Sequence, residues 1–196
     1  MRRDNKGFSL IELIVIMALI GILGTFFITN LGAINYTAAK GCANSIKTAI
    51  GKTRIKTMGK KETYLYIYKD GNRYMSKTVN KSSKTSEGIK VDSTDELTDR
   101  KVSVSYKIKK KDGSYTSDSQ ISGSNYLLIG FNRETGKVDV SGDTVSFDTV
   151  SADLSPAKDI TTGDDATNII ITVISGPNKY EINLHVATGK VEMAKL

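Results

Sequence analysis

The sequence predicts an α+β fold in which one long amino-terminal helix packs on an antiparallel β-sheet. Three observations predict it. Residues 8–28 are almost entirely apolar, apolar residues then recur every four positions as far as residue 50, and apolar and polar residues alternate from residue 62 onward. Recurrence every three to four residues is typical of a helix, and alternation is typical of a half-buried strand. The 196 residues leave room for one domain of ordinary size plus an appendage.

Residues 8–28 form a segment that is long enough to span a membrane. Only Ser9 and Glu12 are strongly polar within these 21 positions. At about 1.5 Å per residue they give about 31 Å of helix, and the hydrocarbon core of a bilayer is about 30 Å thick. The run is too long for a secretory signal peptide and lacks a small-x-small cleavage site at its end. A lipoprotein signal at Cys42 is excluded because Lys40 lies close before it, well beyond the apolar run.

Glu12 is the residue that a plain single-pass anchor does not explain. A carboxylate inside an apolar span costs about 2.5–3.5 kcal/mol on insertion scales, and such residues usually mark function. If the chain were cut after Gly7, Phe8 would become the amino terminus, one helical turn from Glu12. In an assembly of staggered parallel helices, the Glu12 carboxylate of one chain would then pair with the Phe8 amine of its neighbour and fix the stagger. A lone anchor gains nothing from Glu12, whereas a polymer does.

These residues resemble the class III signal of type IV prepilins and type II secretion pseudopilins. Residues 6–16 read Lys-Gly-Phe-Ser-Leu-Ile-Glu-Leu-Ile-Val-Ile, after a short basic leader and before further apolar residues. Glu12 matches the Glu at the fifth position of the mature family members, and Gly21 matches a Gly at the fourteenth. Many members carry a proline where this chain has Thr29, so we expect no proline kink there.

The resemblance implies that a prepilin peptidase cuts between Gly7 and Phe8 and methylates the new amino terminus of Phe8. It assigns subunit assembly to Glu12 and Phe8. It also implies four segments: a leader at residues 1–7, a transmembrane and polymerisation helix at 8–34, an amphipathic continuation of that helix at 35–58, and an extracytoplasmic β-sheet domain at 59–196.

The implied partners are other pilins, in a homo- or hetero-polymer, the prepilin peptidase, the cytoplasmic membrane and an inner-membrane assembly platform. No cofactor is implied. Basic residues lie on both sides of the span, so counting charges leaves its orientation ambiguous, and the resemblance places the carboxyl-terminal domain outside. The precursor would be a single-pass protein of the cytoplasmic membrane and the assembled product a cell-surface filament. Whether that filament is a pilus or a secretion or competence pseudopilus, and whether the subunit is major or minor, stays open.

Beyond the span, the helical pattern continues with one apolar face. The residues on this face are Ile34, Ala38, Cys42, Ile46 and Ile50. This spacing predicts an amphipathic helix, and Gly59 predicts its end near Met58. Because Cys42 lies on the apolar row, we expect it to be a small buried hydrophobic residue and not a reactive thiol.

The remaining pattern predicts strands joined by tight turns. The expected strands lie at residues 63–69, 74–75, 102–108, 125–131, 137–140, 169–174, 180–186 and 190–193, and the expected surface loops at 80–88, 92–99 and 151–167. The continuous apolar run at 169–174 predicts a strand that is buried on both faces or central to the sheet. The sequence Thr-Gly-Lys-Val occurs at 135–138 and again at 188–191, which indicates one type of hairpin used twice.

The composition provides few of the residues that enzymes use for catalysis or metal binding. A single cysteine and a single histidine exclude a disulfide framework and multi-His or Cys-based metal sites. His185 has odd parity with the apolar residues of its strand, so we expect it to face outward, and no Gly-x-Ser-x-Gly elbow supplies a nucleophile. The acidic pairs Asp139 with Asp143 and Asp164 with Asp165 lack an EF-hand pattern, so solvated loops are favoured over a calcium site.

The net charge of +7 raises a second class of function. Lys107, Lys109, Lys110 and Lys111 cluster at one strand end with tyrosines nearby, which is a footprint of nucleic-acid binding. Scattered charges more often keep a surface soluble or contact an anionic cell wall, so DNA is retained only as an alternative partner. The sequence therefore predicts a structural filament subunit that is not an enzyme. The alternatives are a signal-anchored surface binding domain that does not polymerise, and a minor or tip subunit that binds DNA or a surface.

Overall fold

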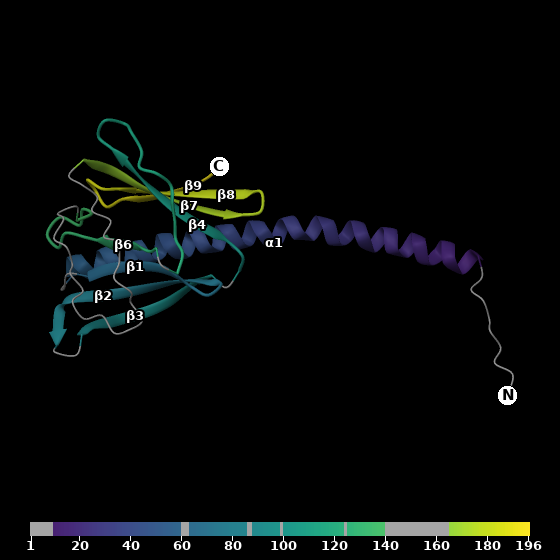
Figure 1. Ribbon diagram of the computed structural model, residues 1–196, viewed down its shortest axis with the longest axis horizontal. Coiled ribbons are helices and arrows are strands. Elements are labelled where there is room, and N and C mark those ends of the chain that lie inside the picture. The colour runs from purple at the N-terminus through teal and green to yellow at the C-terminus, as the bar shows by residue number, and fades with distance from the viewer. Residues whose placement is uncertain (1–9, 60–62, 86–87, 99, 124, 140–164) are drawn as a thin grey trace.

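The computed structural model describes residues 10–59, 63–85, 88–98, 100–123, 125–139 and 165–196, without the side chains of 25–34 and 80–90. Its longest element is helix α1, Leu10–Gly59, and the α+β class predicted from the sequence is confirmed. Figure 1 shows the first part of α1 projecting from the sheets while its second part lies along them. The predicted cleavage site at Gly7 and Phe8 lies outside the described residues.

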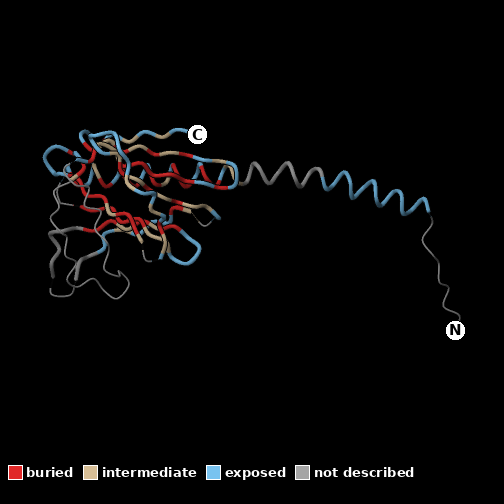
Figure 2. The backbone as a smooth tube through the Cα atoms, turned by 45° about the horizontal axis from the view of Figure 1, so that its top comes forward, coloured by how far each residue is buried: buried red, intermediate tan, exposed pale blue. Residues whose placement is uncertain are grey.

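The projecting part of α1 is apolar and exposed. From Leu10 to Leu23 every described position is exposed, as the tube in Figure 2 shows. Among the residues that the structure describes, no helix has both the length and the apolar character needed to cross a membrane. The membrane-spanning helix expected over residues 8–34 therefore stays a prediction.

The second part of α1 buries the face that the sequence pattern predicted. Ala38, Cys42, Ile46 and Ile50 are buried, because residues four apart lie on one side of a helix. Neighbouring positions of the same face are also buried: Ala39, Ala43, Ala49, Thr53 and Thr57. The Thr57 hydroxyl lies 3.0 Å from the Thr53 carbonyl oxygen and 3.1 Å from that of Thr63, so it has a backbone partner on each side of the helix end.

The strands form two antiparallel sheets instead of the single sheet that the sequence predicted. The first has the order β3-β2-β1-β6. Its strands are β1 (Thr63–Asp70), β2 (Arg73–Thr85), β3 (Gly88–Thr98) and β6 (Leu127–Gly130). The second has the order β5-β4-β7-β8-β9. Its strands are β4 (Ser103–Lys110), β5 (Ser119–Gln120), β7 (Ala166–Ser175), β8 (Asn178–His185) and β9 (Val191–Lys195).

Strand β7 is the middle strand of the second sheet, as its apolar run predicted. Residues from Ile169 to Val173 are all buried, because the strand is covered on both faces. Its partner β8 alternates, with Tyr180, Ile182 and Leu184 buried and the residues between them half-buried. Thus β7 is buried on both of its faces, whereas β8 is fully buried on one face only.

Two of the predicted loops are wrong. Residues 80–85 belong to β2, and residues 92–98 belong to β3, which pairs with β2 from Gly88 to Thr98. Strand β3 lies at the edge of its sheet, so backbone pairing holds it without an apolar face, and only Leu97 of its described side chains is buried. The predicted loop at 151–167 falls mainly outside the described residues, and its last two residues belong to β7.

The hairpin predicted around residues 134–136 is shorter than expected. Strand β6 ends at Gly130, and beyond it a single bridge joins Phe131 to Val138. Asp139 N donates to Gly130 O at 2.9 Å, while Val138 N donates to the Val186 carbonyl oxygen at 3.0 Å, so the returning chain contacts both the end of β6 and the end of β8.

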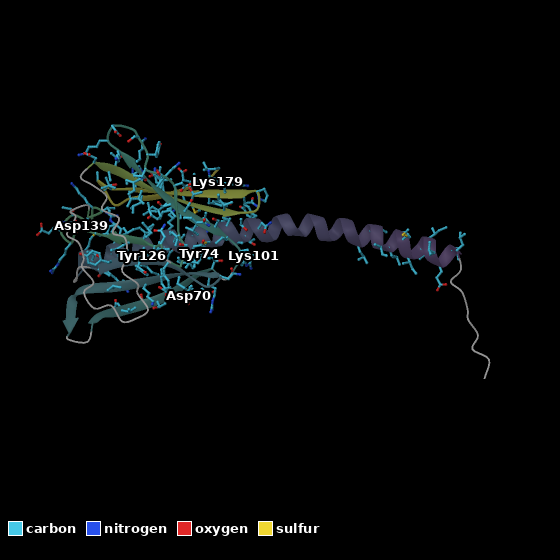
Figure 3. All side chains as sticks on the ribbon, viewed as in Figure 1. Asp70, Tyr74, Lys101, Tyr126, Asp139 and Lys179 are labelled. Carbon is cyan, nitrogen blue, oxygen red and sulfur yellow. The ribbon has the colours of Figure 1, made fainter. Side chains whose placement is uncertain are left out.

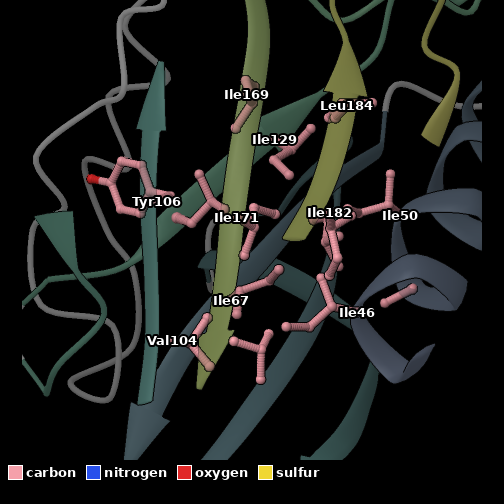
Figure 4. Close-up of a cluster of buried hydrophobic side chains, with 14 of the residues drawn as sticks. Ile46, Ile50, Ile67, Val104, Tyr106, Ile129, Ile169, Ile171, Ile182 and Leu184 are labelled. Carbon is pink, nitrogen blue, oxygen red and sulfur yellow. The ribbon is translucent and has the colours of Figure 1, made fainter. Parts of the chain in front are cut away.

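One hydrophobic core joins α1 to both sheets. Figure 4 shows Ile46 and Ile50 of α1 beside Ile182 of β8, with Ile67 of β1 and Ile171 of β7 in the same cluster. Each of these five side chains is fully buried. Burying a side chain of this size contributes about 1.5–3 kcal/mol, so this core is the main stabilising feature of the domain.

Candidate functional site

The predicted assembly site lies at the start of α1. Glu12 is in the first turn of the helix and is exposed, where the positive end of the helix dipole favours a carboxylate. Its expected partner Phe8, and the adjacent Gly7, lie outside the described residues. The pairing of Glu12 with a neighbouring Phe8 is thus an expectation that this structure leaves open.

Around Glu12, the surface of α1 is exposed and apolar on all sides of the helix. Large apolar side chains in this segment are 43% to 78% exposed. They are Leu10, Ile11, Leu13, Ile14, Val15, Ile16, Met17, Leu19, Ile20, Ile22 and Leu23. Contiguous apolar surfaces of this extent mark contact with a membrane or with other protein chains. Such a segment can pack against lipid, against copies of itself, or against each in turn.

A second arrangement lies where the buried half of α1 ends. Two turns, at residues 132–137 and 185–190, repeat the same backbone hydrogen bonds. Asn132 N donates to Lys137 O at 2.8 Å, and His185 N donates to Lys190 O at 2.9 Å. Gly136 and Gly189 have φ angles of 65° and 64°, a left-handed conformation that favours glycine. The hairpin type predicted from the repeated Thr-Gly-Lys-Val sequence is confirmed, and we call these two segments the paired turns.

The paired turns pack directly against each other and against Arg54 of α1. A Cβ atom on Gly189 would overlap the Gly136 carbonyl oxygen. The Arg54 guanidinium donates from Nε to Gly136 O at 2.9 Å and from Nη2 to Thr188 O at 2.9 Å. One side chain therefore joins the helix end to both turns. Sequence reasoning missed this role of Arg54, although the repeated turn sequence indicated that two similar turns exist.

His185 lies on the outer face of β8, as the sequence predicted. Its side chain is 36% exposed, with Nδ1 at 3.0 Å from Asn168 Nδ2 and Nε2 at 3.4 Å from Glu192 Oε2. Lys190 forms an ion pair of 2.6 Å with the other oxygen of Glu192. Hydrogen bonds from Lys190 and then from His185 hold the pKa of Glu192 below its ordinary value. These contacts form a small polar network on the sheet surface.

The remaining predicted sites are the buried thiol and the candidate metal ligands. Cys42 is 1% exposed, and burial raises the pKa of its thiol to about 12, so the predicted role as a small buried residue is confirmed. Among the described residues, no group of three or more His, Cys, Asp or Glu side chains is placed to hold a metal ion. Asp143 and Asp164, which the sequence offered as calcium ligands, lie outside these residues.

The predicted basic cluster is partly assembled on β4. Lys107 Nζ lies 4.9 Å and Lys109 Nζ 5.9 Å from the ring centre of Tyr115, which is 51% exposed. Lys110 and Lys111 are exposed at the end of the strand. The structure thus brings an aromatic ring and two cations together on the surface.

The comparisons with known proteins concern the amino-terminal segment. The family model described as the prokaryotic N-terminal methylation motif matches residues 2–28, about a seventh of the chain. No curated protein and no solved structure matches the chain significantly. The long helix packed against antiparallel sheets is consistent with a pilin-like fold. Residues 2–28 of this chain are therefore the class III signal of type IV pilins and pseudopilins, which the sequence around Gly7 and Phe8 had predicted.

Proposed function

We propose that this protein is a structural subunit, a pilin or pseudopilin, of a type IV pilus-like filament. The observation that carries the proposal is the exposed apolar half of α1, because the methylation motif at residues 2–28 overlaps it and the single carboxylate of Glu12 lies within it. The described residues from Leu10 to Gly24 are all exposed, so this segment is available for contacts outside the chain. The function is structural and does not involve catalysis.

The proposed precursor sits in the cytoplasmic membrane through residues 8–34, with the sheet domain outside. A prepilin peptidase cuts between Gly7 and Phe8 and methylates the new amino terminus. An inner-membrane platform then moves the helix from lipid into a polymer of pilin subunits. Apolar side chains exchange lipid contacts for helix contacts in this step, so packing and polar pairs, not removal of apolar surface from water, decide the assembly.

In the proposed polymer, the Glu12 carboxylate of one subunit pairs with the amine of Phe8 in the next. Both groups would otherwise be charged and unpartnered in apolar surroundings, which is unfavourable. The pair also selects one axial stagger, because any other register leaves the carboxylate without its counterion. The acidic residues between Phe8 and Asp92 are Glu12, Glu62, Asp70 and Glu87, and among them Glu12 alone lies in the apolar segment.

The test of cleavage is the amino-terminal residue of the mature protein, measured by mass spectrometry. We expect a methylated Phe8. An intact Met1, or a start near residue 40, would contradict the proposal.

The test of assembly is Glu12→Gln, compared with Glu134→Gln, which removes an exposed carboxylate from the distant turn at 132–137. We expect Glu12→Gln to be cleaved and folded but depleted at least about tenfold from sheared surface filaments, since an unpaired amine costs more than about 1.4 kcal/mol there. Glu134→Gln should assemble normally. Unchanged incorporation of Glu12→Gln would contradict the pairing of Glu12 with Phe8. Absence of the unmutated chain from sheared filaments would instead favour an anchored domain that does not polymerise.

A second candidate function, binding of DNA by a minor or tip subunit, is favoured by the ring of Tyr115 between Lys107 and Lys109. The full chain in detergent should then bind duplex DNA with an affinity that falls steeply as salt rises. Replacing Lys107 and Lys109 with Gln should weaken binding. A matched control is Lys77→Gln, since Lys77 also lies over a ring, that of Tyr68. Equal effects of the two changes would remove the site-specific interpretation.

A further inference from the structure

The end of the sheet domain from which α1 projects has its own surface. Figure 1 shows the turn between β7 and β8 and the connection from β3 to β4 at this end, on either side of the helix. Figure 3 labels Lys101 and Lys179 close to the point where the helix leaves the domain. Residues far apart in the sequence therefore meet around one segment of α1.

This surface is basic. Five exposed cations lie here, one on the helix and four on the segments beside it: Lys40, Arg100, Lys101, Lys179 and Lys195. We call them the basic collar. Among the described residues, no carboxylate forms an ion pair with any member of the collar. Glu181 of β8 lies two residues from Lys179 and opposite Ala194, but it has no ion pair with Lys179 or Lys195.

The collar is tied to the helix by specific contacts. Arg100 Nη1 donates to Thr37 Oγ1 at 2.9 Å, which places one guanidinium beside the helix. A Cβ atom on Gly176, in the β7–β8 turn, would lie 2.8 Å from Asn35 Nδ2, so this turn approaches α1 closely. Two of the segments that carry the collar, the β3–β4 connection and the β7–β8 turn, therefore contact the helix directly.

Tyr36 adds an aromatic ring at the same level. Its ring centre lies 6.2 Å from that of Tyr180, and the Nζ atoms of Lys195 and Lys40 lie 5.1 Å and 5.5 Å from it. Hydrogen bonds from Tyr180 and Lys40 hold the pKa of Tyr36 below its ordinary value. Tyrosines and lysines are the residues that typically lie at the level of lipid headgroups, because each has an apolar stem and a polar tip.

The length of the helix places this ring near a bilayer surface. If the expected span ends at residue 34, Tyr36 follows it by two residues, and if the span ends at residue 28, Tyr36 follows it by eight. These separations correspond to about 3 to 12 Å along the helix. The headgroup layer adds about 5–8 Å to each side of the hydrocarbon core. Long lysine and arginine side chains reach across the remaining gap.

We propose that the basic collar binds anionic phospholipid headgroups and seats the sheet domain on the membrane before assembly. The inference rests on the proposed function, because only a chain anchored through α1 presents the collar to lipid. Five cations without carboxylate partners, arranged around the helix, match a sheet of phosphates better than they match a single small ligand. In this state the domain has a defined orientation, which it must leave when the subunit enters a filament.

The experiment uses the full chain in vesicles of phosphatidylcholine alone or of phosphatidylcholine mixed with phosphatidylglycerol. An amine reagent that does not cross membranes labels the lysines, and mass spectrometry measures the rate at each one. We expect Lys101, Lys179 and Lys195 to be labelled about threefold to fivefold more slowly in the anionic vesicles, with recovery at high salt. Lys110 and Lys111, exposed at the opposite end of β4, should react equally in both.

A variant pair makes the result specific. Lys101→Gln with Lys179→Gln should abolish the lipid-dependent protection of Lys195, whereas Lys110→Gln with Lys111→Gln should preserve it. Equal labelling in both lipids, or protection that salt does not reverse, would overturn the collar proposal. Flotation of the vesicles distinguishes a failure of membrane anchoring from a failure of the collar proposal. A chain that does not float with either lipid contradicts membrane anchoring itself, whereas a chain that floats without lipid-dependent protection contradicts only the collar.

Discussion

The two halves of α1 are both rich in apolar residues, yet they have opposite surroundings. Ile16 in the first half is 43% exposed, whereas Ile46 in the second half is fully buried against strands of both sheets. The first half is apolar all round, and the second half has one apolar face and one polar face. A single continuous helix therefore serves two environments.

The difference shows that the spacing of apolar residues along a helix, more than their number, indicates what covers that part of the helix. A face repeated every four residues fits one side of a folded domain, so the chain itself covers it. A segment that is apolar on every side exceeds what one domain can cover and needs a surrounding apolar medium. Membrane lipid and a bundle of like helices are both such media, and the proposed subunit would pass from one to the other.

The strongest test of this comparison changes one isoleucine in each half. Ile46→Ala should lower the free energy of unfolding by about 2–5 kcal/mol, because it leaves a cavity in the core. Ile16→Ala should lower it by less than about 0.5 kcal/mol, since its side chain contributes nothing to the domain core. Urea unfolding of the full chain in mild detergent, followed by circular dichroism, measures both. Equal losses would mean that the first half also packs on its own domain.

A second test concerns how the buried half is held at its end. Gly189→Ala should destabilise the domain by about 2–4 kcal/mol, because the residue has positive φ and its new methyl group would overlap the Gly136 carbonyl. The matched control is Gly71→Ala, which has a φ of 56° but nothing within 4 Å of a Cβ atom, and should cost about 1–2 kcal/mol. Thermal unfolding compares the two. If both substitutions lower the free energy of unfolding equally, the close contact between the paired turns is not stabilising.

Arg54 should matter less than the contact between the turns that it joins. Arg54→Ala removes two hydrogen bonds to carbonyl oxygens, and we expect a loss of about 1–2 kcal/mol because the guanidinium is partly exposed. Lys47→Ala, an exposed change on the same helix, is the control and should be near neutral. The same unfolding measurement applies. A neutral Arg54→Ala would show that core packing alone fixes the end of α1.

The smallest expected effect is a dependence on pH in the carboxyl-terminal hairpin. The folded protein holds the pKa of Glu192 below its ordinary value of 4.5, so this group stabilises the fold above that pH and loses its contribution as the pH falls through the folded pKa. In the Glu192→Gln variant, the free energy of unfolding should therefore fall slightly less steeply below about pH 5. Solvent screening keeps the effect slight. An unchanged pH profile would show that the network of Lys190, His185 and Glu192 contributes nothing.

Much of the fold could be predicted because its pattern is strong. The long helix and its buried row, the central strand β7 and the alternating strand β8 all follow from the periodicity of apolar residues. The methylation motif could be predicted for a different reason. The peptidase must read a short linear signal, so its residues are contiguous, and a family model matches that same segment.

Strand β3 and the division into two sheets could not be predicted. An edge strand such as β3 is held by backbone pairing with β2, and backbone groups are the same in every residue, so its polar side chains indicate a loop. Likewise, the strands of both sheets show the same alternation, and no local pattern states which strands share a sheet.

The amino-acid sequence by itself determined the helix, its change from an all-apolar to a one-sided surface, and the signal at Gly7 and Phe8. These depend on neighbours within a few turns of chain. Only the tertiary structure decided that Arg54 would join two turns, and that Arg100 and Lys179 would lie near the same part of α1 as Lys40. Such groupings arise when distant strands pack on a common core, and the packing geometry of that core, not the spacing of the residues, sets which side chains meet.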